Sequence, residues 1–271
     1  MRSSIMWNYI EEEQEVLSRL IQSIQTDEFA EKKGLELKAI YFVAHGSSFN
    51  AAVSVLSYYT RNAGVRAYAY TPGNFCSGCS AVALEDPAST LVVVISQTGT
   101  SSGAIEALEY AKTLNLNTLS ITAVNGSPVA LKADHKLCLM CGDENSNAKT
   151  KGYSATLTLL LLLALSIGLK NGTLDLTKKL AGIDEISRMI QSIPEIYERA
   201  LNFCRRTKFG KYMSDLYVLG SGMNFGTAQE GQLKHMETMC IPTMFNDIGE
   251  FSHGMHRSIN EKSSVLLIKS D

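Results

Sequence analysis

The sequence predicts an α/β fold in which a parallel sheet is covered by helices on both faces. From Ala39 onward, short runs rich in β-branched and aromatic residues alternate with helical stretches. These runs are almost continuously apolar, which is typical of strands that are buried on both faces. A strand, a Gly/Ser turn and a helix occur in this order twice, so the sequence also indicates duplicated lobes.

The first predicted element is an amphipathic helix at the amino terminus, assigned to residues 1–35. Within residues 7–32, apolar side chains recur at helical spacing among acids and amides. No apolar stretch of the signal-peptide kind occurs before Glu11. We therefore expect this helix to have a packing role, and we expect a cytoplasmic location.

The first lobe is assigned to residues 36–172. Its expected strands are five short runs: Ala39–Ala44, Val65–Tyr70, Leu91–Ile95, Thr118–Thr122 and Lys136–Met140. A helix over 104–111 is expected to join the third and fourth strands, closed by Asn115. The most hydrophobic run, Leu157–Leu169, is shorter than the roughly 20 residues that cross a bilayer. It predicts a buried helix and no membrane span.

A helical connector and a second lobe follow. Residues 173–212 are expected to be mostly helical, with Pro194 starting or kinking a second helix. The second lobe is assigned to residues 213–271 and repeats the opening of the first: a strand at 216–219, the turn Gly220-Ser221-Gly222, a helix over 225–240, and strands at 243–245 and 265–268. We expect this lobe to be truncated, because the first lobe has two further strands and a long helix beyond the corresponding point.

Charge and cysteine usage exclude two classes of site. The formal net charge is -2, whereas general nucleic-acid binders rely on Lys and Arg to neutralise phosphates. Two Cys-x-x-Cys pairs, Cys76/Cys79 and Cys138/Cys141, suggest a four-thiolate zinc site. However, the second pair falls in a predicted strand, where residues three apart point to opposite faces. We expect reduced thiols and no metal.

The sharpest local signal is a cluster of hydroxyl groups after the third predicted strand. The run Ser96-Gln97-Thr98-Gly99-Thr100-Ser101-Ser102 follows a buried strand and precedes a helix. Free backbone N–H groups and the positive helix end attract an anion, and a glycine allows the backbone to approach it closely. Without a Gly-Lys phosphate loop or a dinucleotide fingerprint, the pattern favours a small phosphate ligand. The alternative is that Ser101 or Ser102 only caps the helix.

Motifs spread over both lobes resemble those of the sugar isomerase (SIS) family of phosphosugar-binding proteins. They are His45-Gly46-Ser47-Ser48, Ser96-Gln97-Thr98-Gly99, Glu144 through Lys151, Glu230 through Glu237, and Glu250-Phe251-Ser252-His253-Gly254. Within the family the chain looks most similar to fructosamine-6-phosphate deglycases and to the isomerase half of glucosamine-6-phosphate synthase. The resemblance implies a three-layer, flavodoxin-like SIS fold in each lobe, no cofactor, and a homodimer with shared active sites.

The resemblance also assigns residues that bind substrate. The implied phosphate cradle consists of Ser48, Ser96, Gln97, Thr98 and Ser101. Lys234 is implied to bind the sugar. Lys149 stands where the synthase-like pattern has serine. It either adds a charge to the site or is a solvated lysine at the rim.

Two residues are implied to be catalytic. Glu237 matches the family base that moves a proton between C1 and C2 of the open-chain sugar. Its alternative is an exposed ion-pair ladder, because Glu230, Lys234 and Glu237 share one helix face. His253 matches the family histidine that assists ring opening and that reaches the site from the neighbouring subunit. A structural histidine is its alternative.

The predicted function is that of a deglycase or isomerase acting on a ketosamine or amino-sugar 6-phosphate. One alternative is simple aldose-ketose isomerisation. Another is a non-catalytic regulator that binds a sugar phosphate; only about 35 residues precede the first strand, and no helix-turn-helix domain is expected among them. The synthase's glutaminase domain does not occur in the sequence, so glutamine-dependent amination is not expected from this chain alone.

Overall fold

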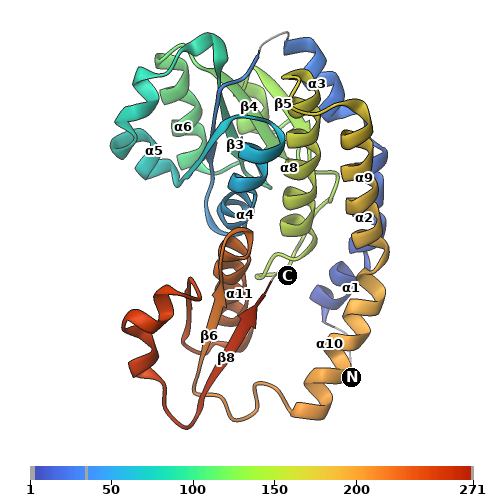
Figure 1. Cartoon of the computed structure of the whole chain (residues 1–271), viewed down its shortest axis with the longest axis vertical. Helices are drawn as coiled ribbons and strands as arrows, with labels where there is room; N and C mark the ends of the chain where they lie inside the picture. Colours follow the sequence, from blue (N-terminus) through green and yellow to red (C-terminus); the bar gives the residue numbers. More distant parts are fainter. Residues whose placement is uncertain (1–3, 34–35, 270–271) are drawn as a thin grey trace.

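The computed structural model describes residues 4–33 and 36–269 and contains two parallel sheets (Figure 1). The larger sheet has the order β2-β1-β3-β4-β5 and the smaller has the order β7-β6-β8. Every strand pair in both sheets is parallel. The predicted α/β fold with parallel sheets and two lobes is therefore confirmed.

The five predicted strands of the first lobe are all present. They are β1 (Ala39–Val43), β2 (Arg66–Tyr70), β3 (Thr90–Ile95), β4 (Asn117–Thr122) and β5 (His135–Cys138). The helices between and after them are α4 (Gly46–Asn62), α5 (Pro72–Gly78), α6 (Ser102–Thr113), α7 (Pro128–Lys132) and α8 (Lys151–Lys170). Two short 3-10 helices, η1 (Ser80–Leu84) and η2 (Pro87–Ser89), precede β3.

The central strands are apolar throughout because both faces of the sheet are covered. Every residue of β1 and of β3 is buried. Ile40 and Phe42 pack with buried side chains of α4 and α8 on one face. Tyr41 and Val43 pack with α5 and α6 on the other face. Successive side chains of one strand thus enter two different cores, as the pleat requires.

The amino-terminal segment forms three helices, so the prediction of one long helix is wrong. They are α1 (Ile5–Glu11), α2 (Glu13–Gln22) and α3 (Gln25–Lys33). The break between α2 and α3 lies at Ser23, whose backbone is extended with φ -77° and ψ 136°. There the Gln25 amide accepts a hydrogen bond from Cys138 N at 2.8 Å and donates one to Cys138 O at 3.0 Å. A side chain thereby takes the place of a neighbouring strand at the free edge of β5.

Helix α8 confirms the predicted buried helix. It is long and apolar enough to cross a membrane by length and composition, but 72% of its most apolar window is buried inside the protein. It packs against α2, α3 and α4, which precede it in the chain, and against α9 (Leu176–Gln191). The apolar character of α8 therefore serves the core of the first lobe.

Strand β5 is shorter than predicted. It ends at Cys138, and Met140 has a left-handed backbone with φ 52°. Cys141 consequently lies beyond the strand, so the argument that the two thiols point to opposite faces of a sheet does not apply to this pair. All six cysteines are unbridged, and no group of three or more His, Cys, Asp or Glu within the described ranges is arranged to hold a metal ion.

The second lobe repeats the strand arrangement of the first. After α9 and α10 (Ile193–Thr207), with Pro194 in the first turn of α10, come β6 (Asp215–Gly220), α11 (Met223–Met239), β7 (Thr243–Asn246), η3 (Glu250–His253), η4 (Met255–Ser258) and β8 (Ser263–Ile268). The order β7-β6-β8 matches β2-β1-β3, with the first strand of the lobe in the centre. The helices that follow the two central strands, α4 and α11, pack against each other.

A glycine allows this close helix contact. A Cβ atom on Gly226 of α11 would lie 2.3 Å from Ser54 Oγ and 2.6 Å from Asn50 O of α4. Any larger residue would push the two helices apart. Gly226 thus allows α4 and α11 to pack closely where the two lobes meet.

Candidate functional site

A cavity of about 300 Å³ lies where the two lobes meet, at the carboxyl ends of β1 and β3. Its volume is within the range of small-ligand sites. It is lined by His45, Gly46, Ser47, Ser48, Gln97, Thr98, Lys149, Gly152, Tyr153, Leu233 and Glu237. Neighbouring strands β1 and β3 end at the same edge of a parallel sheet, which brings their turns together.

The turn after β1 opens the amino terminus of α4 toward this cavity. Gly46 has a left-handed backbone with φ 56°, and His45 caps α4 without a side-chain hydrogen bond. The hydroxyl-bearing residues Ser47 and Ser48 lie in the first turn of the helix and line the cavity. Hydroxyls beside a helix amino terminus are suited to an anionic ligand.

In the turn after β3, some polar residues line the cavity and others do not. Gly99 has φ 67°, and a Cβ atom there would lie 2.0 Å from Ser127 Oγ. Ser96 is buried, and its hydroxyl accepts a hydrogen bond from Gly99 N at 3.2 Å. Gln97 and Thr98 line the cavity, whereas Ser101 is the N-cap residue of α6 and does not. Of the five residues predicted as a phosphate cradle, three therefore line the cavity and two do not.

Glu144 organises the segment that enters α8. Its buried carboxylate accepts hydrogen bonds from the Gln97 amide at 3.0 Å, from Thr150 N and Oγ1 at 2.8 and 2.9 Å, and from Gly152 N at 2.9 Å. Burial by itself would raise the pKa of Glu144, but the donated hydrogen bonds outweigh it and lower the pKa below its usual range. Glu144 therefore stays ionised and holds Gln97 in place.

Lys149 lies at the cavity wall. Its ammonium group donates to the backbone oxygens of Glu144 at 2.6 Å and Ser146 at 3.4 Å. An ammonium group has three donors, so one remains for a ligand. Lys149 also lines a second cavity of about 190 Å³ next to the first. The structure thus places its charge at the border of the two cavities.

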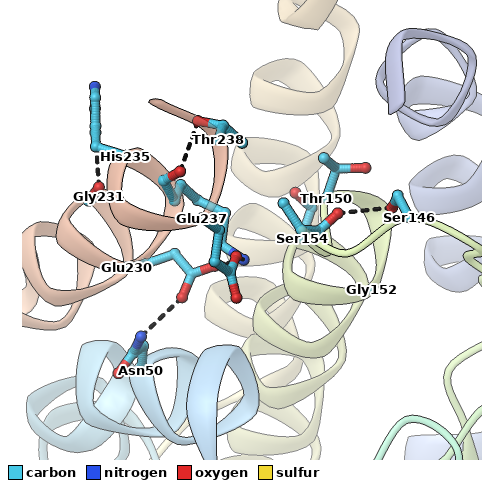
Figure 2. A network of polar contacts seen from close by, with 12 residues as sticks. Asn50, Ser146, Thr150, Gly152, Ser154, Glu230, Gly231, His235, Glu237 and Thr238 are labelled. Carbon is cyan, nitrogen blue, oxygen red and sulfur yellow. Dashed lines mark hydrogen bonds and ion pairs between the residues drawn. The ribbon is translucent and has the colours of Figure 1, made fainter. Parts of the chain in front are cut away.

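The second lobe contributes one face of α11 (Figure 2). Glu230 is buried and accepts a hydrogen bond from Asn50 Nδ2 at 2.8 Å. Lys234 lies between two carboxylates, with Nζ 3.4 Å from Glu230 and 2.5 Å from Glu237. Burial raises the pKa of Glu230, opposed by the Asn50 hydrogen bond and the Lys234 charge. Glu237 lines the same cavity as the turns of the first lobe.

Comparison with known proteins identifies the first lobe. Residues 36–166 match the family described as SIS domain. The first lobe is a SIS domain. The chain is 26% identical to the glutamine--fructose-6-phosphate aminotransferase [isomerizing] of Fusobacterium nucleatum over 97% of this chain and 44% of that protein. It matches 29% of the length of the Caldanaerobacter subterraneus protein of that description. The chain therefore spans less than half the length of each of these two relatives.

Solved structures resemble the whole SIS-domain protein. A candidate phosphosugar isomerase from Clostridium difficile has a TM-score of 0.90 at 27% identity, covering 98% of this chain and 75% of that one. The carboxyl-terminal domain of glucosamine-fructose-6-phosphate aminotransferase from Francisella tularensis also has a TM-score of 0.90, at 21% identity, with the same shares covered. The second likeness concerns the fold alone.

The SIS-domain protein brings together most, but not all, of the residues predicted from its motifs. Ser48, Gln97, Thr98, Lys149 and Glu237 share the larger cavity. Lys234 does not line it and instead contacts Glu237. His253 is exposed on η3 and is not among the lining residues of this chain's cavity.

Sequence reasoning missed two residues of this SIS-domain site. Tyr153 lines the cavity, and burial raises its pKa to about 12, so it acts as a neutral hydroxyl. Glu144 was noticed only as part of a motif, although it holds Gln97. The available signal was the position of Glu144 in the polar stretch 143–147, shortly before a strongly apolar helix.

Glu13 on α2 gives the SIS-domain protein a testable pH dependence. Burial and the nearby charge of Glu144 raise the pKa of Glu13 to about 7, against a hydrogen bond from Ser154. A carboxyl with a raised folded-state pKa stabilises the fold most below its unfolded-state pKa, and this contribution is lost as pH rises through 7. We expect Glu13→Gln to gain stability relative to the unaltered protein by about 2 to 3 kcal/mol between pH 5 and pH 8.

Urea unfolding at a series of pH values measures this difference. Glu15→Gln is the matched control, because Glu15 lies on the same helix with a side chain that is 78% exposed. Stability curves for Glu13→Gln and the unaltered protein that run parallel across this pH range would contradict the expectation.

Proposed function

We propose that this chain binds a sugar 6-phosphate in the larger cavity and moves a proton between C1 and C2 of a ketosamine or amino-sugar phosphate. Glu237 is the proposed base. The turns that contain Ser48, Gln97 and Thr98 are the proposed phosphate site. The names of the relatives, which concern fructose 6-phosphate, and the SIS family match support a phosphosugar ligand.

One observation supports this proposal most directly. A carboxylate from the second lobe, Glu237, and the anion-binding turns of the first lobe line the same cavity. Phosphate at one wall would fix the sugar so that its C1 and C2 lie near the opposite wall. Lys234, 2.5 Å from Glu237, places a positive charge beside the base. This charge would stabilise the oxyanion that develops at C2.

The proposed reaction of a ketosamine balances without a cofactor. Glu237 removes a proton from C1, the bonding pair forms the C1=C2 double bond, and the C2 oxygen takes a proton. Glu237 then returns a proton to C2 while the nitrogen loses its own, which leaves a C1=N imine. Water adds to C1, the C1–N bond breaks, and an amine and an aldose 6-phosphate result.

We further propose that His253 acts from a second copy of the chain in a cytoplasmic homodimer. Within one chain it does not line the cavity, and an imidazole can exchange a proton with a ring oxygen near neutral pH. Ring opening is the step proposed for it. Aldose-ketose isomerisation uses the same proton transfer with oxygen in place of nitrogen at C1, and it ends at the aldehyde without hydrolysis of an imine.

A substrate panel tests the proposal. The chain is incubated with fructosamine, glucosamine and fructose 6-phosphates, and aldose 6-phosphate, ammonia and ketose 6-phosphate are measured. Aldose 6-phosphate from the ketosamine is the expected result. Ammonia from glucosamine 6-phosphate would point to a deaminase, and ketose-aldose interconversion alone to an isomerase. Tight binding of the sugar phosphates without any turnover would contradict catalysis and favour a regulator.

A further inference from the structure

The segment between β5 and α8, residues 139–150, has no regular secondary structure and supplies one lining residue, Lys149, to the larger cavity. It carries Glu144 and Lys149 and lines both cavities. Met140 and Gly142 have left-handed backbones within it, with φ 52° and 63°. Leu139 N donates to Thr122 O of β4 at 2.9 Å, and beyond this bond the position of the described loop depends on side-chain contacts.

The loop also contacts α1. Asn145 N donates a hydrogen bond to the Tyr9 hydroxyl at 3.0 Å. Tyr9 is buried, and its ring lies 4.5 Å from the Lys151 ammonium. The hydroxyl therefore holds the loop while the ring covers the first residue of α8.

Lys151, the first residue of α8, forms an ion pair with Glu12, the residue between α1 and α2. Its side chain is only 6% exposed, and Nζ lies 2.5 Å from Glu12 Oε2. A buried ammonium needs a charge partner, because its desolvation is otherwise unfavourable. The Glu12 carboxylate and the Tyr9 ring together supply this stabilisation.

The amino-terminal helices also hold the two ends of the loop. Ser154, one turn into α8, donates to Glu13 Oε1 at 3.1 Å. Gln25 pairs with both backbone groups of Cys138, where β5 ends. The loop is thus bounded on both sides by contacts from α1 to α3, although about 110 to 140 residues separate the partners in sequence.

We propose that Tyr9, Glu12 and Lys151 form a latch that positions loop 139–150 for ligand binding. They are positioning residues: they act through Glu144 and Lys149 and do not line either cavity themselves. The identity of the ligand rests on the proposed function. The proposed position of the loop is independent of the proposed function.

Hydrogen exchange of the ligand-free chain tests the latch. Tyr9→Phe keeps the ring but removes the acceptor for Asn145 N, and we expect exchange of the Asn145 amide to become about tenfold faster. Glu12→Gln removes the charge partner of Lys151 and should speed exchange in the same peptides. Tyr212→Phe, whose parent residue is 72% exposed, is the control. Unchanged exchange in residues 139–150, or a rise spread over the whole first lobe, would overturn the proposal.

A binding measurement separates positioning from general stability. By calorimetry, Tyr9→Phe should weaken binding of fructose 6-phosphate about fivefold and weaken binding of inorganic phosphate less, because Ser48 and Thr98 do not belong to the loop and only Gln97 is hydrogen-bonded to it through Glu144. Equal weakening of both ligands, or of neither, would overturn the positioning role. An unaltered chain that binds neither ligand would contradict the proposed function, and the exchange result would still decide whether the latch exists.

Discussion

Replacing Glu237 by glutamine is expected to lower turnover of the ketosamine phosphate by about 10³-fold. The amide has the same shape, but it cannot accept a proton from carbon. Affinity for fructose 6-phosphate should stay within about threefold, because the turns after β1 and β3 are unchanged. Initial rates of aldose 6-phosphate formation and calorimetric binding measure the two effects separately.

A matched exchange of the same residue type serves as the control for this variant. Glu195→Gln on α10 alters a carboxylate that is 75% exposed and belongs to neither cavity. It should retain full turnover. Turnover of Glu237→Gln equal to that of the control would remove Glu237 as the base, and the exposed ion-pair ladder would then explain the Lys234 contact.

Replacing Glu144 by alanine is expected to lower the free energy of unfolding by about 3 to 5 kcal/mol. The change removes the acceptor of four hydrogen bonds, three of which come from the backbone or side chain of Thr150 and Gly152. The donors would remain buried or half-buried without their partner. Urea unfolding at neutral pH measures the loss.

The pH dependence and a neighbouring variant sharpen this test. Because the folded-state pKa of Glu144 is lowered, its stabilising contribution is present above the unfolded-state pKa and is lost as pH falls through the folded value. The difference in the free energy of unfolding between Glu144→Ala and the unaltered protein should therefore become smaller at acidic pH. Asp143→Ala, an exposed neighbour, should change stability by less than about 0.5 kcal/mol. Similar losses for both variants would contradict an organising role of Glu144.

The local sequence pattern predicted the sheet of the first lobe well, because strands that are buried on both faces consist almost entirely of apolar residues. The continuous run Leu91–Ile95 could only be a buried strand or a buried helix segment, and its length favoured the strand. The amino-terminal helices show the limit of such reasoning. Ser23 ends α2 where Gln25 binds the backbone of Cys138, a contact across more than 100 residues that periodicity does not contain.

The candidate site was predictable in part as a set of residues, since five predicted residues line the larger cavity, but the role of each side chain was not predictable. Ser96 and Gln97 are adjacent in sequence, yet one hydroxyl turns back to Gly99 N while the other side chain reaches Glu144. Lys234 was predicted to bind substrate, and in the structure its ammonium group lies between the carboxylates of Glu230 and Glu237. The direction of each of these side chains depends on partners in other helices and loops, and a local motif does not contain those partners.

Helix α8 has a consequence for synthesis on the ribosome. Its hydropathy is that of a segment that targeting factors could accept as a membrane span, so exposure of the nascent helix carries a risk of misdirection or aggregation. Of the four helices described above as packing against α8, three (α2, α3 and α4) leave the ribosome before it does, and α9 follows. The order of elements along the chain therefore supplies most of the cover for α8 by the time it emerges.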